Sequence, residues 1–178
     1  MTDVMDAGPV KPEWWTSDHW STPWDIVHRL EDEFGKFNLD PCCRDETAKA
    51  DIYYTKKHNG LSMPWSGRVF MNPPYSRPGP WLEKAIQATT SMQEAATLVV
   101  ALLPVRTDTR WFHQFVWGKA EIRFIKGRIK WLGWQGTPIP NPKDPSMFAI
   151  YRRTCELPKL QPLRATLCPR SDRGSAEA

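Results

Sequence analysis

A continuous apolar run over residues 98–105 constrains the fold of this chain more than any other feature. A strand without polar alternation is typical of the middle of a parallel sheet, where both faces are covered. Helix-like segments flank the run over 81–92 and 109–119. Further strands are expected over 37–40, 51–55, 68–71, 121–131 and 147–152. This alternation predicts an open α/β sheet, mostly parallel with a late antiparallel strand, and with helices on both faces.

Another helix is expected before the first strand. Thr22 is a good N-cap residue, Pro23 suits the first helical position, and Asp25 completes an approximate capping box. Gly35 is expected to end this helix.

The chain has 178 residues, which suits one domain. A folded unit is expected over 14–153, after a flexible arm over 1–13 and before a disordered, basic, Pro-rich tail over 154–178. No apolar run reaches the ~20 residues of a membrane helix. The start carries no signal-peptide pattern, so we expect a cytoplasmic protein.

Charge and cysteine spacing restrict the partners. The formal net charge of +4 permits a polyanionic partner without requiring one. The four cysteines lack paired zinc-ligand spacing, so we expect thiols and no metal. No membrane or protein partner is indicated.

Polar residues stand where two predicted strands end. Asp40 closes the strand over 37–40, and Asn72 follows the strand over 68–71. Ligands bind outside the carboxyl ends of the strands in open α/β sheets. We therefore expect Asp40 and Asn72 to face one crevice.

The sequence Asn72-Pro73-Pro74-Tyr75 carries the strongest chemical signal. A residue before proline is held extended, and proline has a fixed φ and no N–H. The loop is therefore stiff and presents two acceptors, the Asn72 amide oxygen and the Pro73 carbonyl. Two fixed acceptors can hold both N–H groups of a planar amine, while Tyr75 offers a face for stacking. The plainer alternative is a tight Pro-Pro turn with Tyr75 in the core.

This loop matches the [DNS]-P-P-[YFW] signature of amino-methyltransferases. Segments 18–23, 39–43 and 59–61 resemble the Thr-Pro, Asp-Pro and adenine-contacting segments of phage-type DNA N-6-adenine methyltransferases, often called Dam-like. The resemblance covers roughly residues 18–152. It implies a Rossmann-like class I methyltransferase sheet and S-adenosyl-L-methionine as cofactor.

The resemblance also assigns roles to residues. The catalytic residues are expected to be Asn72, Pro73, Pro74 and Tyr75. The cofactor-binding residues are expected to be Trp20, Thr22, Pro23, Asp40, Pro41 and Asn59. Simple capping, turn or packing roles are the alternatives for the second group.

Two groups of basic and polar residues are candidates for DNA binding. Arg106, Thr107, Asp108 and Arg110 follow the central apolar strand. Lys126, Arg128 and Lys130 alternate along the strand predicted over 121–131, which would place them on one face as a phosphate track. A solvated loop and a solvated strand face are the alternatives.

The resulting hypothesis is a site-specific DNA methyltransferase that acts on the N6 amine of an adenine flipped from the duplex. Two alternatives stay open: an amino-methyltransferase for RNA or a protein glutamine, and a non-catalytic nucleic-acid-binding module.

Overall fold

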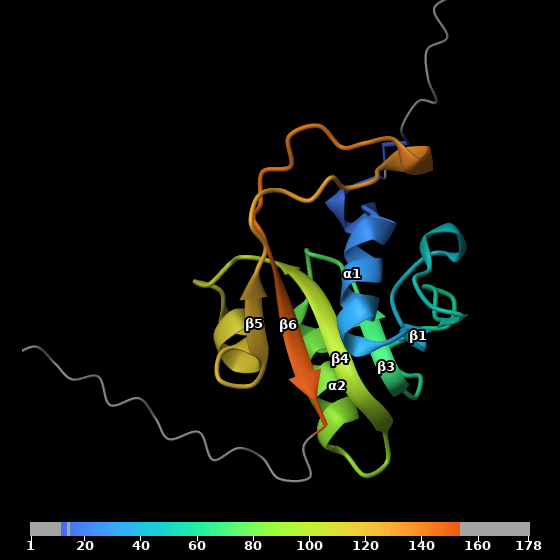
Figure 1. Cartoon of the computed structure of the whole chain (residues 1–178), viewed down its shortest axis with the longest axis vertical. Coiled ribbons are helices and arrows are strands. Elements are labelled where there is room, and N and C mark those ends of the chain that lie inside the picture. Colours follow the sequence, from blue (N-terminus) through green and yellow to red (C-terminus); the bar gives the residue numbers. More distant parts are fainter. Residues whose placement is uncertain (1–11, 14, 154–178) are drawn as a thin grey trace, which may run out of the picture.

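The computed structural model describes residues 12–13 and 15–153 (Figure 1). The expected tail over 154–178, and the expected arm over 1–13 apart from Pro12 and Glu13, lie outside the described residues. The helices and strands are α1 (Trp24–Phe34), β1 (Leu39–Asp40), β2 (Ile52–Tyr53), β3 (Ser66–Met71), α2 (Gly79–Thr90), β4 (Ala95–Pro104), β5 (Glu121–Phe124) and β6 (Ser146–Arg152). Short 3-10 turns lie at Ser17–His19, Asp45–Thr47 and Trp134–Gly136, and a π-helix at Phe112–Val116.

Within the described residues, six strands form one sheet in the order β2-β1-β3-β4-β6-β5. Strands β1 to β4 pair in parallel, whereas β6 runs antiparallel to both of its neighbours. The predicted mostly parallel sheet with a late antiparallel strand is therefore confirmed.

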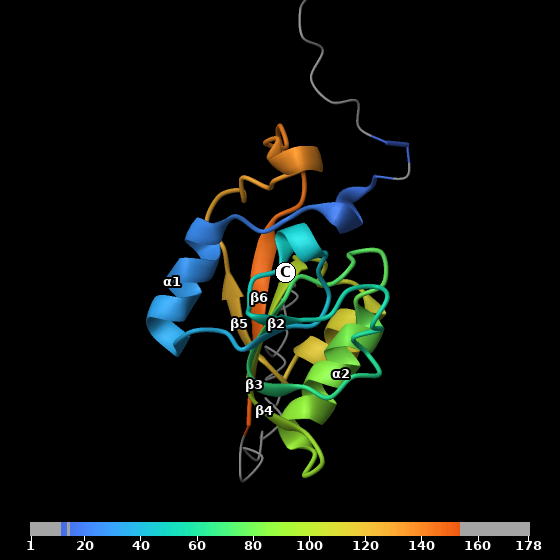
Figure 2. The ribbon, with the colours of Figure 1, turned by 90° about the vertical axis from the view of Figure 1, so that its right-hand side faces the viewer.

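Helices cover both faces of this sheet (Figure 2). Val27 and Leu30 of α1 pack on one face with Phe37 and Phe70. On the other face, α2 and the π-helix share a second apolar cluster with β3 and β4. The central strand β4 is buried from Leu98 to Pro104, as a strand covered on both faces should be. No helix in the described part of the chain is both long and apolar enough to cross a bilayer.

The capping prediction for α1 is wrong. The helix begins at Trp24, so Pro23 occupies the N-cap position and not the first helical one. Thr22 then lies one residue too early to bond the free N–H groups of the first turn. Its hydroxyl is instead buried, without a hydrogen-bond partner among the described residues. Gly35 does end the helix, with a φ of 79°.

Four predicted elements are shorter than expected. The strands predicted over 37–40 and 51–55 are reduced to β1 and β2, of two residues each. The helix predicted over 109–119 is helical only over 110–116, most of it the π-helix Phe112–Val116, and Gly118 follows at a φ of 72°. Tyr151 donates to the Phe115 carbonyl over 2.9 Å. The strand predicted over 121–131 ends at Phe124, since Gly127 turns the chain at a φ of 86°.

The alternation expected for three basic residues is wrong for the same reason. They lie in the loop after β5, where their side chains are exposed; they are Lys126, Arg128 and Lys130.

Candidate active site

A pocket of about 400 Å³ opens at the carboxyl ends of β1 and β3. Asp40 at the end of β1 and Asn72 just after β3 both line it, so the predicted shared crevice is confirmed. Parallel strands place their carboxyl ends at one edge of a sheet, which explains how residues far apart in sequence meet. Other predicted site residues lining the pocket are Trp20, Thr22, Pro41, Asn59 and Pro74. Pro23, Pro73 and Tyr75 are not among its lining residues.

In the side-chain amide of Asn72, the nitrogen makes a hydrogen bond and the oxygen does not. Its Nδ2 atom donates to the Trp20 carbonyl over 3.0 Å. Its Oδ1 atom is buried and accepts no hydrogen bond from any described residue. A buried acceptor without a donor is costly, and such cases in native proteins call for an explanation. An N–H group of a bound ligand would satisfy this oxygen.

Tyr75 packs beside the pocket. Its ring meets Trp131 edge-on at 6.0 Å between centroids, and its hydroxyl is buried without a hydrogen-bond partner among the described residues. Burial raises the pKa of the phenol well above its usual value, so Tyr75 remains protonated at neutral pH.

Asp40 is 3% exposed and holds the turn that follows β1. Its carboxylate accepts the backbone N–H of Cys42 over 3.4 Å and that of Lys49 over 3.1 Å. Burial raises the pKa of this carboxyl to about 7, and the two backbone bonds oppose that rise. The Asp40 side chain therefore fixes the backbone of the segment after β1, which lines this part of the pocket.

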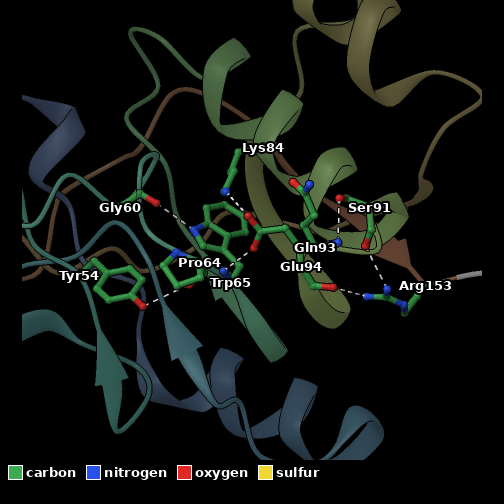
Figure 3. Close-up of polar contacts among 9 residues, drawn as sticks. All are labelled: Tyr54, Gly60, Pro64, Trp65, Lys84, Ser91, Gln93, Glu94 and Arg153. Carbon is green, nitrogen blue, oxygen red and sulfur yellow. Dashed lines mark hydrogen bonds and ion pairs between the residues drawn. The ribbon is translucent and has the colours of Figure 1, made fainter.

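The loop over 54–65 brings Asn59 to the pocket. Figure 3 shows the polar contacts that Gly60 and Trp65 make in this loop. Trp65 donates from Nε1 to the Gly60 carbonyl over 2.9 Å, and its backbone N–H donates to Glu94, which also pairs with Lys84. A Cβ at Gly60 would lie 2.0 Å from the Pro41 carbonyl oxygen. Only glycine therefore allows the loop to lie against the Asp40–Pro41 turn. Asn59 itself is exposed, and its Nδ2 donates to Ser62 over 2.7 Å.

The predicted DNA-binding residues lie outside the pocket. Arg106, Thr107, Asp108 and Arg110 are exposed just beyond the carboxyl end of β4, where Arg106 pairs with Asp144 over 2.9 Å. Lys126, Arg128 and Lys130 follow β5, which runs parallel to β4, so they leave the sheet at the same edge. Both groups therefore lie on the side of the sheet where the pocket opens.

Several pocket residues escaped the sequence analysis. Trp81 lies in the first turn of α2, shortly after the Asn-Pro-Pro-Tyr loop. Its closeness in sequence to that loop could have identified it as a pocket residue. Arg44 lines the pocket and donates to the His19 carbonyl over 3.0 Å, a contact across 25 positions that no local pattern announces. Among the described residues, no three His, Cys, Asp or Glu side chains gather closely enough to hold a metal ion.

Three polar groups converge on the pocket: the Thr22 hydroxyl, the Asp40 carboxyl and the Asn72 amide oxygen. Together with the mostly parallel sheet, they define an α/β protein with a binding site at the carboxyl ends of its strands. Residues 12–159 match the family described as DNA N-6-adenine-methyltransferase (Dam). The chain belongs to this family and is a DNA adenine-N6 methyltransferase.

Two phage relatives support this placement. A DNA N-6-adenine-methyltransferase of Haemophilus phage HP1 is 34% identical over 138 residues, which cover 75% of this chain and 78% of the relative. One of Escherichia phage T1 is 34% identical over 114 residues, 63% of this chain and 46% of the relative. Among solved structures, a candidate RNA methyltransferase from Pyrococcus horikoshii covers 68% of each chain at 14% identity, with a TM-score of 0.42.

Proposed function

We propose that the chain transfers the methyl group of S-adenosylmethionine to the N6 amine of an adenine flipped out of DNA, with Asn72 holding the amine. The observation that carries this proposal is the buried, unbonded Asn72 Oδ1 at the pocket. A planar NH₂ group supplies the donor that this oxygen lacks.

The pocket residues fit the proposed donor molecule. Asp40 would accept hydrogen bonds from hydroxyl or amine groups, and the unbonded Thr22 hydroxyl is free to bond a carboxylate or amine. Asn59 lines the same pocket and lies next to the glycine that brings its loop against Pro41. When bound, S-adenosylmethionine supplies a methyl group already activated by its sulfonium.

The Asn-Pro-Pro-Tyr loop would act by positioning. The Asn72 Oδ1 accepts one N–H of the amine, and the Pro73 carbonyl accepts the other. The two acceptors orient the nitrogen lone pair and stabilise the positive charge that develops on nitrogen during transfer. Tyr75, held by Trp131, offers its ring to the adenine. One proton of the amine then leaves to solvent through the open side of the pocket, and the methylated nitrogen keeps its other N–H.

The exposed cations at the carboxyl edge would hold the DNA backbone. Arg106 and Arg110 follow β4, and Lys126, Arg128 and Lys130 follow β5. Phosphate contacts fix the orientation of a protein on the duplex but do not read its sequence. Thr107 and Asp108 are the uncharged and acidic members of the same loop, and Asp108 can accept from a cytosine amine.

Replacing Asn72 by alanine tests the assignment. Loss of a preorganised acceptor should lower kcat by on the order of 10²–10³-fold, while the Kd for S-adenosylmethionine stays within a few-fold. The exposed amide of Gln87 on α2 provides a matched control, since Gln87→Ala should leave both values unchanged. Wild-type turnover by Asn72→Ala would refute the role of Asn72.

The substrate class is tested separately with labelled methyl donor. DNA, RNA and protein substrates are offered in parallel, and digestion of the DNA should return N6-methyladenine. Label in RNA or protein alone would contradict the proposal, as would a chain that binds no donor in calorimetry.

A further inference from the structure

The orientation of the Asn72 amide depends on a turn far away in the sequence. The Trp20 carbonyl accepts the Asn72 Nδ2 donor across 52 positions. If the amide rotated by half a turn, Oδ1 would face the Trp20 carbonyl oxygen, and two acceptors would meet without a proton between them. The Trp20 carbonyl therefore directs Oδ1 toward the pocket.

The 3-10 turn Ser17–His19 fixes the position of Trp20. The backbone N–H of Trp20 donates to the Ser17 carbonyl over 3.1 Å. On its other side, the His19 carbonyl accepts a hydrogen bond from Arg44 over 3.0 Å. The turn is thus bonded both within itself and to the segment after β1.

Asp18 joins the same turn to the far end of the Asn-Pro-Pro-Tyr loop. Its Oδ1 accepts the backbone N–H of Ser76 over 3.0 Å, and its Oδ2 accepts the Ser76 hydroxyl over 2.5 Å. The loop is therefore held at both ends by one turn, through Asn72 at its start and Ser76 just after it. The two prolines between them have fixed φ angles, so the segment moves largely as a unit.

We propose that Asp18 is a positioning residue for methyl transfer, because its two bonds to Ser76 keep the turn in register with the loop and so keep Asn72 Oδ1 aimed at the amine. The proposal rests on the proposed function. Asp18 also lines the pocket, but the role proposed for it acts through Ser76 and Trp20. A displacement near 1 Å in a reacting group lowers rates by up to about 100-fold, so a loosened loop affects the rate more than binding.

The test compares Asp18→Ala with Asp18→Asn in the full chain. Alanine removes both bonds to Ser76, and we expect kcat to fall by on the order of tenfold or more, with the Kd for S-adenosylmethionine within twofold. Asparagine can accept the Ser76 N–H and donate to its hydroxyl, so Asp18→Asn should recover most of kcat. Both variants lose the same charge, which separates positioning from electrostatics. Asp32→Ala removes an exposed acid from α1 and is the control, with unchanged kcat.

Ser76→Ala, in the wild-type and Asp18→Asn backgrounds, keeps the proposal testable if Asp18→Ala folds poorly, and a double-mutant cycle with Asp18→Ala extends the test. Ser76→Ala removes one of the two bonds and should lower kcat by about threefold in the wild-type background. In the Asp18→Asn background, Ser76→Ala should cost the same factor, whereas with Asp18→Ala it should cost nothing further.

Three results would overturn the positioning role. They are an unchanged kcat in Asp18→Ala, an equal fall in both Asp18 variants, and losses that multiply in the double mutant with alanine. A fall in donor affinity and thermal midpoint that matches the fall in kcat would also overturn it, because it indicates a structural role alone. Absence of N6-methyladenine with the wild-type chain would instead refute the proposed function itself.

Discussion

Asn72 and Asp40 both bring oxygen atoms to the pocket, but only the Asp40 carboxyl changes its protonation state with pH. The Asn72 amide cannot titrate, so its free Oδ1 is an acceptor at every pH. The Asp40 carboxyl is buried, which raises its pKa to about 7 and leaves it partly protonated near neutral pH. The strength of Asp40 as an acceptor should therefore depend on pH.

Donor binding should strengthen as the pH rises through about 7. Above that pH the Asp40 carboxyl is ionised, and hydrogen bonds to an ionised acceptor are stronger than those to a neutral one by roughly 1 kcal/mol. The Kd for S-adenosylmethionine, measured by calorimetry, should fall by about fivefold between pH 6 and pH 8. Asp40→Asn should bind more weakly at pH 8 and show no such slope. A wild-type Kd that does not change, or that rises, would contradict this role of Asp40.

The loop over 54–65 depends on one close backbone contact. Gly60 lies against the Pro41 carbonyl, and Trp65 bonds the Gly60 carbonyl from inside (Figure 3). Lys84 and Glu94 connect Trp65 to α2 and to the start of β4. The pocket wall near Asn59 is thereby attached to the central sheet.

Gly60→Ala should separate this loop from the Asp40–Pro41 turn. A Cβ at 2.0 Å from a carbonyl oxygen forces the backbone apart, at a cost of about 1–3 kcal/mol in the free energy of unfolding. The donor Kd should rise as well, since both segments line the pocket. Gly79→Ala is the matched control, because its Cβ would lie 3.6 Å from Phe115, at ordinary contact distance. Equal thermal midpoints in the two variants would argue against a tight contact at Gly60.

Segments with local signals were predictable, and contacts over long sequence distances were not. The buried run of β4 and the strand ends at Asp40 and Asn72 follow from hydrophobic patterning and the rule for parallel sheets. The helix expected over 109–119 ends at Val116, and the free Phe115 carbonyl in its last turn is bonded by Tyr151, which lies 36 positions away. The bond between Asp18 and Ser76 joins residues 58 positions apart, and neither residue type signals the other.

The surface around the pocket carries charge suited to a polyanion. Exposed cations follow both β4 and β5 at the edge where the pocket opens. The opposite edge also carries lysines, since Lys36 precedes β1 and Lys119 precedes β5. Removing two lysines from either end of the strands gives variants of equal net charge, whose DNA binding can be compared.

The salt dependence of DNA binding should arise from the cations that lie beside the pocket. Lys126→Ala combined with Lys130→Ala should reduce the slope of log K against log salt concentration by about 2, because each lost phosphate contact removes about 0.9. Lys36→Ala combined with Lys119→Ala removes the same charge and should leave the slope nearly unchanged. Titrations of a labelled duplex at several salt concentrations measure both. Equal slopes for the two double variants would show that DNA does not approach this edge.

The place of β6 in the sheet bears on how the protein forms during translation. Although it is the last strand of the described residues, it lies between β4 and β5 and pairs with both. Until the ribosome has released residues 146–152, β5 has no neighbour to bond and one long side of β4 stays open. Domains fold as units while synthesis proceeds, so the nascent sheet must wait for nearly all of its sequence. Exposed strand edges in that interval invite aggregation, and chaperone binding to stalled chains should fall sharply once β6 emerges.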